Sequence, residues 1–163
     1  MAIDVYLYID GIKGESADER HKEWIECKSV SWGVEQPKSA TSSTGGGHTA
    51  ERTEHKDIVI AKLADLATPL LLQNCSSGKT IPKAKIEFLR ADGQGERIKY
   101  FEIELENVLI SNVSPRVEAG DILSENLSLK YSKVKWKYTQ QKVGGGSGGN
   151  TSGGWDLSAN KTA

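Results

Sequence analysis

The sequence has little of what marks a membrane protein, a disulfide-bonded scaffold or a nucleic-acid-binding protein. Its two cysteines in 163 residues, Cys27 and Cys75, are too few for a disulfide framework and are in keeping with a reducing cytoplasm. No apolar run approaches the length that spans a bilayer, and Met1 to Asp4 does not begin a secretory signal peptide. The formal net charge of −1 gives no general reason for binding nucleic acid or an anionic membrane. We therefore expect no nucleic acid as partner and no membrane insertion.

Motifs of cofactor binding are also scarce. Residues 77–80, Ser-Gly-Lys-Thr, resemble the end of a phosphate-binding loop. That loop requires a glycine five positions before Gly78, where this chain has Gln73, and it precedes its helix, whereas residues 77–80 follow one. These residues are better explained as a helix end, and we expect no cofactor.

The titratable residues give no catalytic or metal-binding pattern. The three histidines lie in polar segments without a tight carboxylate or cysteine companion, so we expect no zinc site. Cys75 is expected to be a small core residue, because no histidine is placed to activate it. Glutamates alternate with apolar residues on one strand, as on a solvated strand face. We therefore expect no enzyme. The histidines and these glutamates are His21, His48, His55, Glu102, Glu104 and Glu106.

One short helix is predicted between Thr68 and Gly78. Thr68 is a natural N-cap, and Pro69 suits the first helical position because its missing N–H costs nothing there. Gly78 tolerates the left-handed conformation that ends a helix. Since a helix of this length is marginal alone in water, we expect it to lie against a sheet.

Most of the remaining chain alternates apolar and polar residues with the period of a half-buried strand. The clearest runs are 3–9, 83–90 and 101–106, and an Asp-Gly hairpin connection joins the last two. Residues 127–131 and 134–138 place their apolar side chains on opposite parities, which predicts a bulge or bend near Ser132. Seven or so antiparallel strands with one wet face favour a closed or nearly closed barrel.

Two segments are rich in glycine and serine. The stretch from Gly33 to Lys56 is a long extended loop, for which a solvated linker and a contact arm are both open interpretations. Residues 144–154 are expected to be a Gly/Ser linker. The predicted organisation is a barrel domain over 1–143, this linker, and a C-terminal strand or tail of the same domain over 155–163. The fold class is mainly β: an antiparallel β-barrel of two packed sheets with one flanking helix.

Several short motifs follow one another in a fixed order along the chain. They are the opening strand with Ile12–Ser16, then Ser31–Val34, Thr68–Leu71, Cys75–Lys79, Val108–Ser111, Val113–Ser114, Ser124–Leu129 and Gly154–Leu157. In order and spacing they resemble the haemolysin-coregulated protein (Hcp) family, the tube protein of the bacterial type VI secretion system. The resemblance is carried by the ordered set of motifs.

The resemblance implies a structural subunit that assembles head-to-tail into hexameric rings, which stack into a tube. The implied partners are further copies of the chain, the sheath and spike (VgrG-type) proteins, and small effector proteins carried in the lumen. It also implies synthesis in the bacterial cytoplasm and secretion from the cell without a signal peptide. A monomeric ligand-binding β-barrel and a phage-tail-tube-like subunit are the alternatives.

The resemblance also suggests contact residues. Ser31 is similar to a lumen-facing position of the family, and an ordinary outward serine on a strand is the competing interpretation. The long loop from Gly33 to Lys56 resembles the family's extended arm, which reaches across subunit or ring boundaries. Its candidate contact residues are Ser39, Ser42, Gly46, His48 and Arg52.

Overall fold

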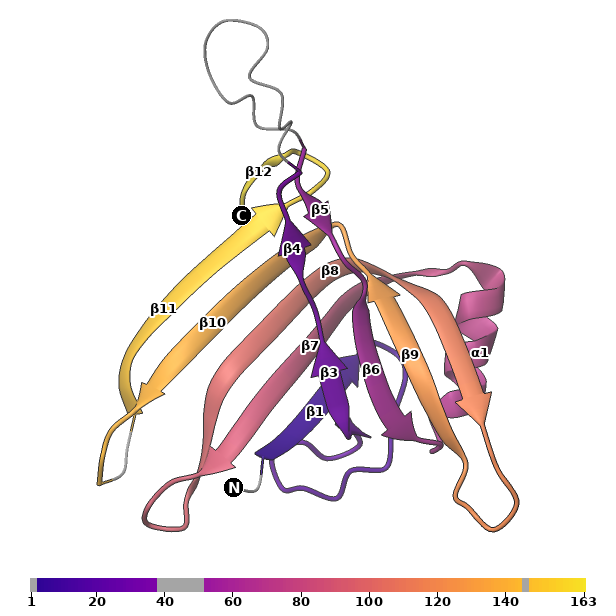
Figure 1. The fold of residues 1–163 in the computed structure, drawn as a ribbon, viewed down its shortest axis with the longest axis horizontal. Helices are drawn as coiled ribbons and strands as arrows, with labels where there is room; N and C mark the ends of the chain where they lie inside the picture. Colours follow the sequence, from indigo (N-terminus) through magenta and orange to yellow (C-terminus); the bar gives the residue numbers. More distant parts are fainter. Residues whose placement is uncertain (1–2, 38–51, 145–146) are drawn as a thin grey trace, which may run out of the picture.

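The computed structural model describes residues 3–37, 52–144 and 147–163, which form a mainly β structure with one helix among them (Figure 1). The number of strands exceeds the predicted seven because several are only two or three residues long. The elements are β1 (Ile3–Ile9), β2 (Ile25–Cys27), β3 (Ser29–Ser31), β4 (Val34–Glu35), β5 (Glu54–His55), β6 (Ile58–Leu63), α1 (Thr68–Ser77), β7 (Thr80–Ala91), β8 (Arg97–Arg116), β9 (Ser124–Lys130), β10 (Lys133–Gln141), β11 (Ser147–Asp156) and β12 (Lys161–Thr162).

Two antiparallel sheets organise these strands. The large sheet has the path β12-β11-β10-β8-β7-β1-β2, and β9, β6 and β3 continue from β8; β4 and β5 form a separate two-stranded ladder. The mainly β fold with two sheets and one flanking helix is as predicted. The barrel, however, is not closed. β2 pairs with β1 and β3 pairs with β6, so the chain changes its neighbouring strand at Lys28, and within the described residues no full-length strand joins the β1 edge to the β6 edge.

The long strand β8 pairs with a different strand in each of its two halves. Its first half, Phe101–Glu106, pairs with β10, and its second half, from Leu109 to Arg116, pairs with β9. The chain between β9 and β10 therefore has to bend at Tyr131 and Ser132, where the Ser132 amide donates to the Glu106 carbonyl at 3.1 Å. The bend predicted from the parity change is confirmed.

The core lies between the two halves of the large sheet and follows the predicted alternation. Leu7, Ile86 and Ile103 lie side by side on β1, β7 and β8, and all three side chains are fully buried. From the other side, Ile60 on β6 and Leu127 on β9 are also fully buried and belong to the same cluster. Burying such side chains stabilises the fold by about 1.5–3 kcal/mol each.

The helix ends as predicted but begins differently. Gly78 has φ +66° and its amide donates to the Asn74 carbonyl, which is the expected left-handed C-cap. Thr68 is not the N-cap: it is the first helical residue, and Ala67 occupies the cap position without a side-chain hydrogen bond. The Thr68 hydroxyl is already used, because it donates to Glu125 at 2.9 Å and accepts from the Asp65 amide at 3.0 Å.

The expected linker over 144–154 is wrong for residues 147–154, which belong to β11. This strand pairs with β10 from Gln141↔Ser147 to Lys133↔Asp156. The backbone hydrogen bonds of the ladder hold these residues, although glycine has low strand propensity. Trp155, expected on a final edge strand, lies near the end of β11 and pairs with Thr162 of β12.

Candidate functional site

The outward face of β1, β7, β8 and β10 is densely charged. Register places Lys85 of β7 and Lys135 of β10 on either side of Glu104 of β8. The row of Glu106 repeats the arrangement with a lysine on each adjacent strand, whereas Glu102 faces Glu87 on β7 and a lysine only on β10. The other members of this charged face are Lys83, Glu102, Glu106, Lys133 and Lys137.

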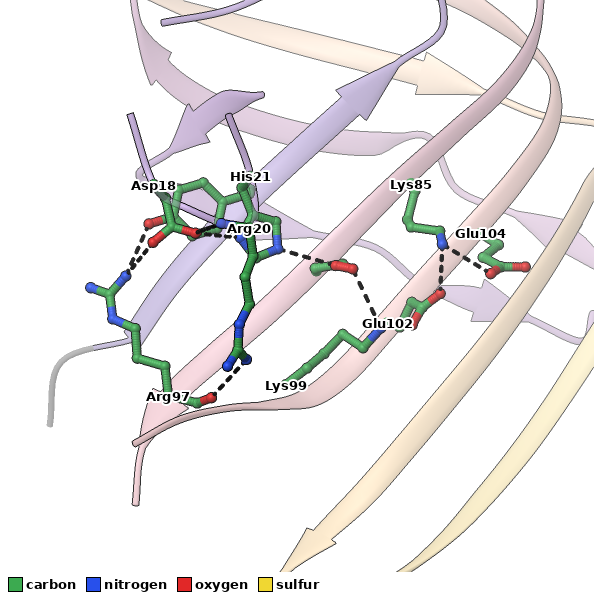
Figure 2. Close-up of polar contacts among 10 residues, drawn as sticks. Asp18, Arg20, His21, Lys85, Arg97, Lys99, Glu102 and Glu104 are labelled. Atoms are coloured by element: carbon green, nitrogen blue, oxygen red, sulfur yellow. Dashed lines mark hydrogen bonds and ion pairs between the residues drawn. The ribbon is translucent and has the colours of Figure 1, made fainter. Parts of the chain in front are cut away.

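A chain of ion pairs crosses this charged face (Figure 2). Lys85 lies 3.3 Å from Glu102 and 3.4 Å from Glu104, and Lys99 bridges Glu102 to Glu87, the latter at 3.3 Å. These pairs link β7 and β8 side by side. Opposite charges facing one another across strands each contribute roughly 0.2–1 kcal/mol.

The neighbouring lysines lower the pKa of Glu102. Burial by itself disfavours the ionised carboxylate, but hydrogen bonds and charges from Lys99 and Lys85 outweigh it and lower the pKa of Glu102 to about 2. Burial likewise disfavours the ammonium groups of Lys85 and Lys99, yet the glutamates raise the pKa of both lysines. Glu102, Lys85 and Lys99 are therefore all ionised near neutral pH.

His21 holds the segment after β1 against β7. Its Nδ1 lies 2.7 Å from Asp18 and its Nε2 lies 3.1 Å from Glu87, while its ring stacks on Tyr6 with centroids 4.4 Å apart. Arg97 contacts Asp18 at 3.0 Å and extends the network, and the hydrogen bond from His21 lowers the pKa of Asp18. His21 is buried, and each of its two ring nitrogens faces a carboxylate.

Sequence analysis missed this role of His21. Asp18 three residues earlier is a carboxylate companion that the sequence does show, whereas Glu87 is 66 residues away and reaches His21 only through the fold. A second missed group lies inside the structure, where Lys62 of β6 is fully buried. Its ammonium contacts Glu125 and lies 3.0 Å from Asp65, which fixes the turn before α1 to β9.

The outward face of β3, β6 and β9 contrasts with the charged one. Ser31 pairs with Val59, and Val59 with Ser128, so Ser31 begins a row of small uncharged side chains. The next row repeats the pattern, and the second half of β8 adds polar side chains to both. We call this the neutral face; its other members are Ser29, Ala61, Asn126, Asn112 and Ser114.

The structure places two of the predicted contact residues. Ser31 is exposed at the end of β3, on the neutral face. Arg52 is exposed, just before β5. Near it, the Thr53 hydroxyl donates to the Glu35 carbonyl at 3.3 Å and helps to join the two strands of the small ladder. Four candidates fall outside the described residues: Ser39, Ser42, Gly46 and His48.

The base of this small ladder rests on β10. His55 Nδ1 lies 2.8 Å from the Tyr131 hydroxyl, and the His55 ring stacks on Trp136 with centroids 6.0 Å apart. Burial lowers the pKa of His55 and, with the Asp57 charge, raises the pKa of Tyr131 to about 12. His55 is therefore a neutral packing residue near pH 7.

Metal and thiol chemistry find little support in the described part of the chain. No cluster of three or more His, Cys, Asp or Glu side chains there is arranged to hold a metal ion. Cys27 and Cys75 are free thiols, and burial raises the pKa of Cys27 to about 12. No helix within the described ranges has the length and apolar character needed to cross a bilayer.

The fold and its surfaces define a mainly β protein of two antiparallel sheets with one flanking helix, distinguished by one charged and one neutral sheet face. Residues 6–138 match the family model described as type VI secretion system effector, Hcp. The chain belongs to this family, and it is therefore a type VI secretion protein.

Individual relatives agree with this assignment. The chain is 38% identical over 165 residues to "Protein hcp1" of Pseudomonas aeruginosa, with all of both chains covered. It is 27% identical to "Major exported protein" of the same organism, covering 91% of this chain and 94% of the relative. The crystal structure of Hcp1 from Salmonella typhimurium superposes with a TM-score of 0.80 at 30% identity over the whole of both chains. Another solved structure, of a type six secretion system protein, gives a TM-score of 0.89 at 27% identity, covering 99% of this chain and all of the other.

Proposed function

We propose that this protein is the tube subunit of a type VI secretion system, forming stacked hexameric rings whose lumen carries small effector proteins. Family membership supports the tube role. The neutral face is the observation that carries the channel: its exposed side chains Ser31, Val59 and Asn126 are uncharged, in contrast to the charged face of β7, β8 and β10. A passage for varied protein cargo needs such a surface, because fixed charges would hold some cargoes and repel others.

In this proposal the neutral face lines the lumen, and the charged face is turned toward the sheath. Copies of the chain, the sheath and spike (VgrG-type) proteins and the effectors are the partners. The protein is synthesised in the bacterial cytoplasm and expelled from the cell with the tube. The role is structural rather than enzymatic, and residues 1–143 and 155–163 act as one domain.

The monomeric ligand-binding barrel has less support. The space between the two halves of the large sheet is filled by side chains such as Leu7, Ile86 and Leu129, each of them fully buried. A ligand carrier of this shape would instead keep an apolar cavity at that place.

The test uses Ser31, which is exposed and makes no contribution to the core. Ser31→Gln lengthens the side chain on the neutral face, so rings should form as in the wild type while effector co-elution falls at least several-fold. Ser29→Gln, on the same strand and face, is the companion variant, and comparing its effector co-elution with that of Ser31→Gln shows how far the effector contact extends along β3. Rings of wild-type mass that retain the effector equally well would contradict the lumen assignment. A wild-type protein that stays a single chain at every concentration would contradict the tube itself.

A further inference from the structure

A hollow of about 330 Å³ opens on the charged face, above β7, β8 and β10. Its aromatic wall is formed by Tyr8 of β1 and Trp24, whose ring centroids lie 5.4 Å apart. Ala84 and Leu105, which face each other across β7 and β8, belong to its lining and are almost fully buried. A concave site that combines an apolar wall with a few charged groups suits the side chains of a partner molecule.

The rim of the hollow is charged and follows the strand register. One row crosses four strands, from Tyr8 on β1 to Lys135 on β10, and the row beside it begins with Lys83 on β7. The hollow holds four lysines against two glutamates, which leaves an excess of two positive charges. We call it the lysine hollow; its charged residues are Lys83, Lys85, Lys133, Lys135, Glu104 and Glu106.

The excess positive charge belongs to two of the four lysines. Lys85 lies 3.4 Å from Glu104 (Figure 2), and Lys133 lies 3.7 Å from the next glutamate of β8. Lys83 and Lys135 are exposed, and neither has an ion-pair partner among the residues that the structure describes. Two unpaired cations beside an aromatic wall are complementary to a ligand that brings an apolar group and two anionic groups.

The glutamates of the hollow discriminate between kinds of anion. Glu104 and Glu106 stand on β8, between the lysines of β7 and those of β10. A nucleic acid carries a charge on every phosphate and would place some of them against these carboxylates. A protein segment can instead place uncharged residues over β8 and carboxylates only at the unpaired lysines. The wall of Tyr8 and Trp24 also suits an apolar side chain, since tyrosine and tryptophan are the residues that most often anchor protein contacts.

The spacing of these groups matches an extended peptide. Lys83 lies one strand and one row from Tyr8, and Lys135 lies three strands from it, which corresponds to roughly 8 Å and 14 Å along the sheet. Alternate side chains of an extended peptide share one face and repeat at about 7 Å. An apolar residue on the aromatic wall therefore brings the second and fourth residues after it toward Lys83 and Lys135.

We propose that the lysine hollow binds an extended acidic segment of a partner protein, in which an apolar residue is followed at the second and fourth positions by Asp or Glu. The apolar side chain packs on Tyr8 and Trp24, and the two carboxylates pair with Lys83 and Lys135. The segment crosses the strands on the charged face, so it occupies no sheet edge. This inference goes beyond the proposed tube function and does not rest on it, because every residue of the site belongs to one chain.

The probe is a fluorescein-labelled peptide, Ser-Ser-Leu-Ser-Glu-Ser-Glu-Ser, titrated with the wild-type protein and followed by fluorescence anisotropy. Binding should be saturable, and peptides with Gln for both Glu, or with Ser for Leu, should bind at least about three-fold more weakly. Lys83→Gln and Lys135→Gln should each raise the Kd about two- to five-fold, which is the range of an exposed ion pair. Far-UV circular dichroism verifies that both variants are folded.

Lys137→Gln is the matched control. Lys137 is exposed on the same strand and face as Lys135 and also lacks an ion-pair partner within the described ranges, but it lies outside the hollow. Its Kd should change less than about 1.5-fold, since only long-range attraction is lost. A loss as large as that of Lys135→Gln would show diffuse charge attraction and overturn the site.

Two further outcomes also overturn the proposal: a wild-type protein that does not bind the peptide, and a short oligothymidylate that binds more tightly and loses affinity in the same lysine variants. The second outcome would assign the hollow to nucleic acid. Light scattering of the same samples keeps this test apart from the tube function. A protein that binds the peptide yet stays a single chain would overturn the tube and leave the lysine hollow in place.

Discussion

His21 and Glu87 stand 66 residues apart in the chain, yet Nε2 of the one lies 3.1 Å from a carboxylate oxygen of the other. This contact attaches the segment after β1 to β7, one of the strands that form the charged face. Because Asp18 holds the second ring nitrogen at 2.7 Å, the buried ring has a carboxylate on each side. The ring therefore links local and distant parts of the sequence in one ion-pair chain.

Replacing His21 by Phe should destabilise the fold by about 2–3 kcal/mol, because the ring stacking survives while Asp18 and Glu87 each lose one hydrogen bond and keep only Arg97 and Lys99 as charged partners. Urea unfolding at pH 7 measures the change. Lys13→Met is the control, since Lys13 pairs with Glu23 at 3.4 Å on the surface, where such a pair contributes about 1 kcal/mol or less. Equal losses for the two variants would contradict the role assigned to His21.

Glu102 should make stability depend on acid. Its pKa is about 2 in the folded protein and 4.5 in an unperturbed glutamate, so the unfolded chain binds the proton more readily. The stability that ionised Glu102 contributes is therefore fully present above pH 4.5 and is lost as the pH falls toward 2. After allowance for solvent screening, Glu102→Gln should cost about 1–2 kcal/mol at pH 7 and nothing near pH 2.

Denaturant unfolding between pH 2 and pH 7 checks this dependence. Glu104→Gln is the control, because that side chain is half exposed and its ion pair with Lys85 is 3.4 Å long. Its cost should stay below about 0.5 kcal/mol at every pH. A Glu102→Gln cost that is the same at pH 2 and pH 7 would rule out the ionised carboxylate as its source.

The buried ion pair of Lys62 should show the asymmetry of such pairs. Lys62→Met leaves Glu125 fully buried without its cation and should destabilise the protein by about 3–5 kcal/mol. Adding Glu125→Leu removes the stranded charge, so the double variant should regain at least about 2 kcal/mol. Guanidinium unfolding of the two single variants and the double variant measures the coupling. A double variant no more stable than Lys62→Met would refute this account.

Gly14 should not tolerate a side chain. A Cβ there would lie 2.5 Å from the Trp24 carbonyl oxygen and 2.8 Å from Ile25 Cα, and both are backbone atoms that cannot turn aside. Gly14→Ala should therefore cost about 1–3 kcal/mol, which lowers Tm by several degrees. Gly93→Ala is the control, with no atom within 4 Å of the added methyl. Differential scanning calorimetry of the two variants makes the comparison, and an unchanged Tm for Gly14→Ala would contradict it.

Local sequence patterns predicted the structure correctly where one physical preference dominated. Alternation along β7 and β8 correctly separated Ile86 and Ile103 from the charged side chains beside them, because period 2 is built into a strand. The end of α1 was found because Gly78 adopts φ +66°, which few other residues adopt. The beginning of α1 was misplaced because Glu125, far along the chain, takes the Thr68 hydroxyl that a cap would use.

By itself the sequence determined the apolar faces, the bend near Ser132, the helix and the family, since each depends on residues near one another or on the order of short motifs. Only the tertiary structure decided that residues 147–154 form a strand, because β10 supplies hydrogen bonds that glycine and serine do not encode. The tertiary structure also brings His21 to Glu87 and Lys62 to Glu125. It leaves the barrel unclosed, because the chain changes its neighbouring strand from β1 to β6 at Lys28. Such contacts depend on register between distant strands, which is set by the packing of the whole core.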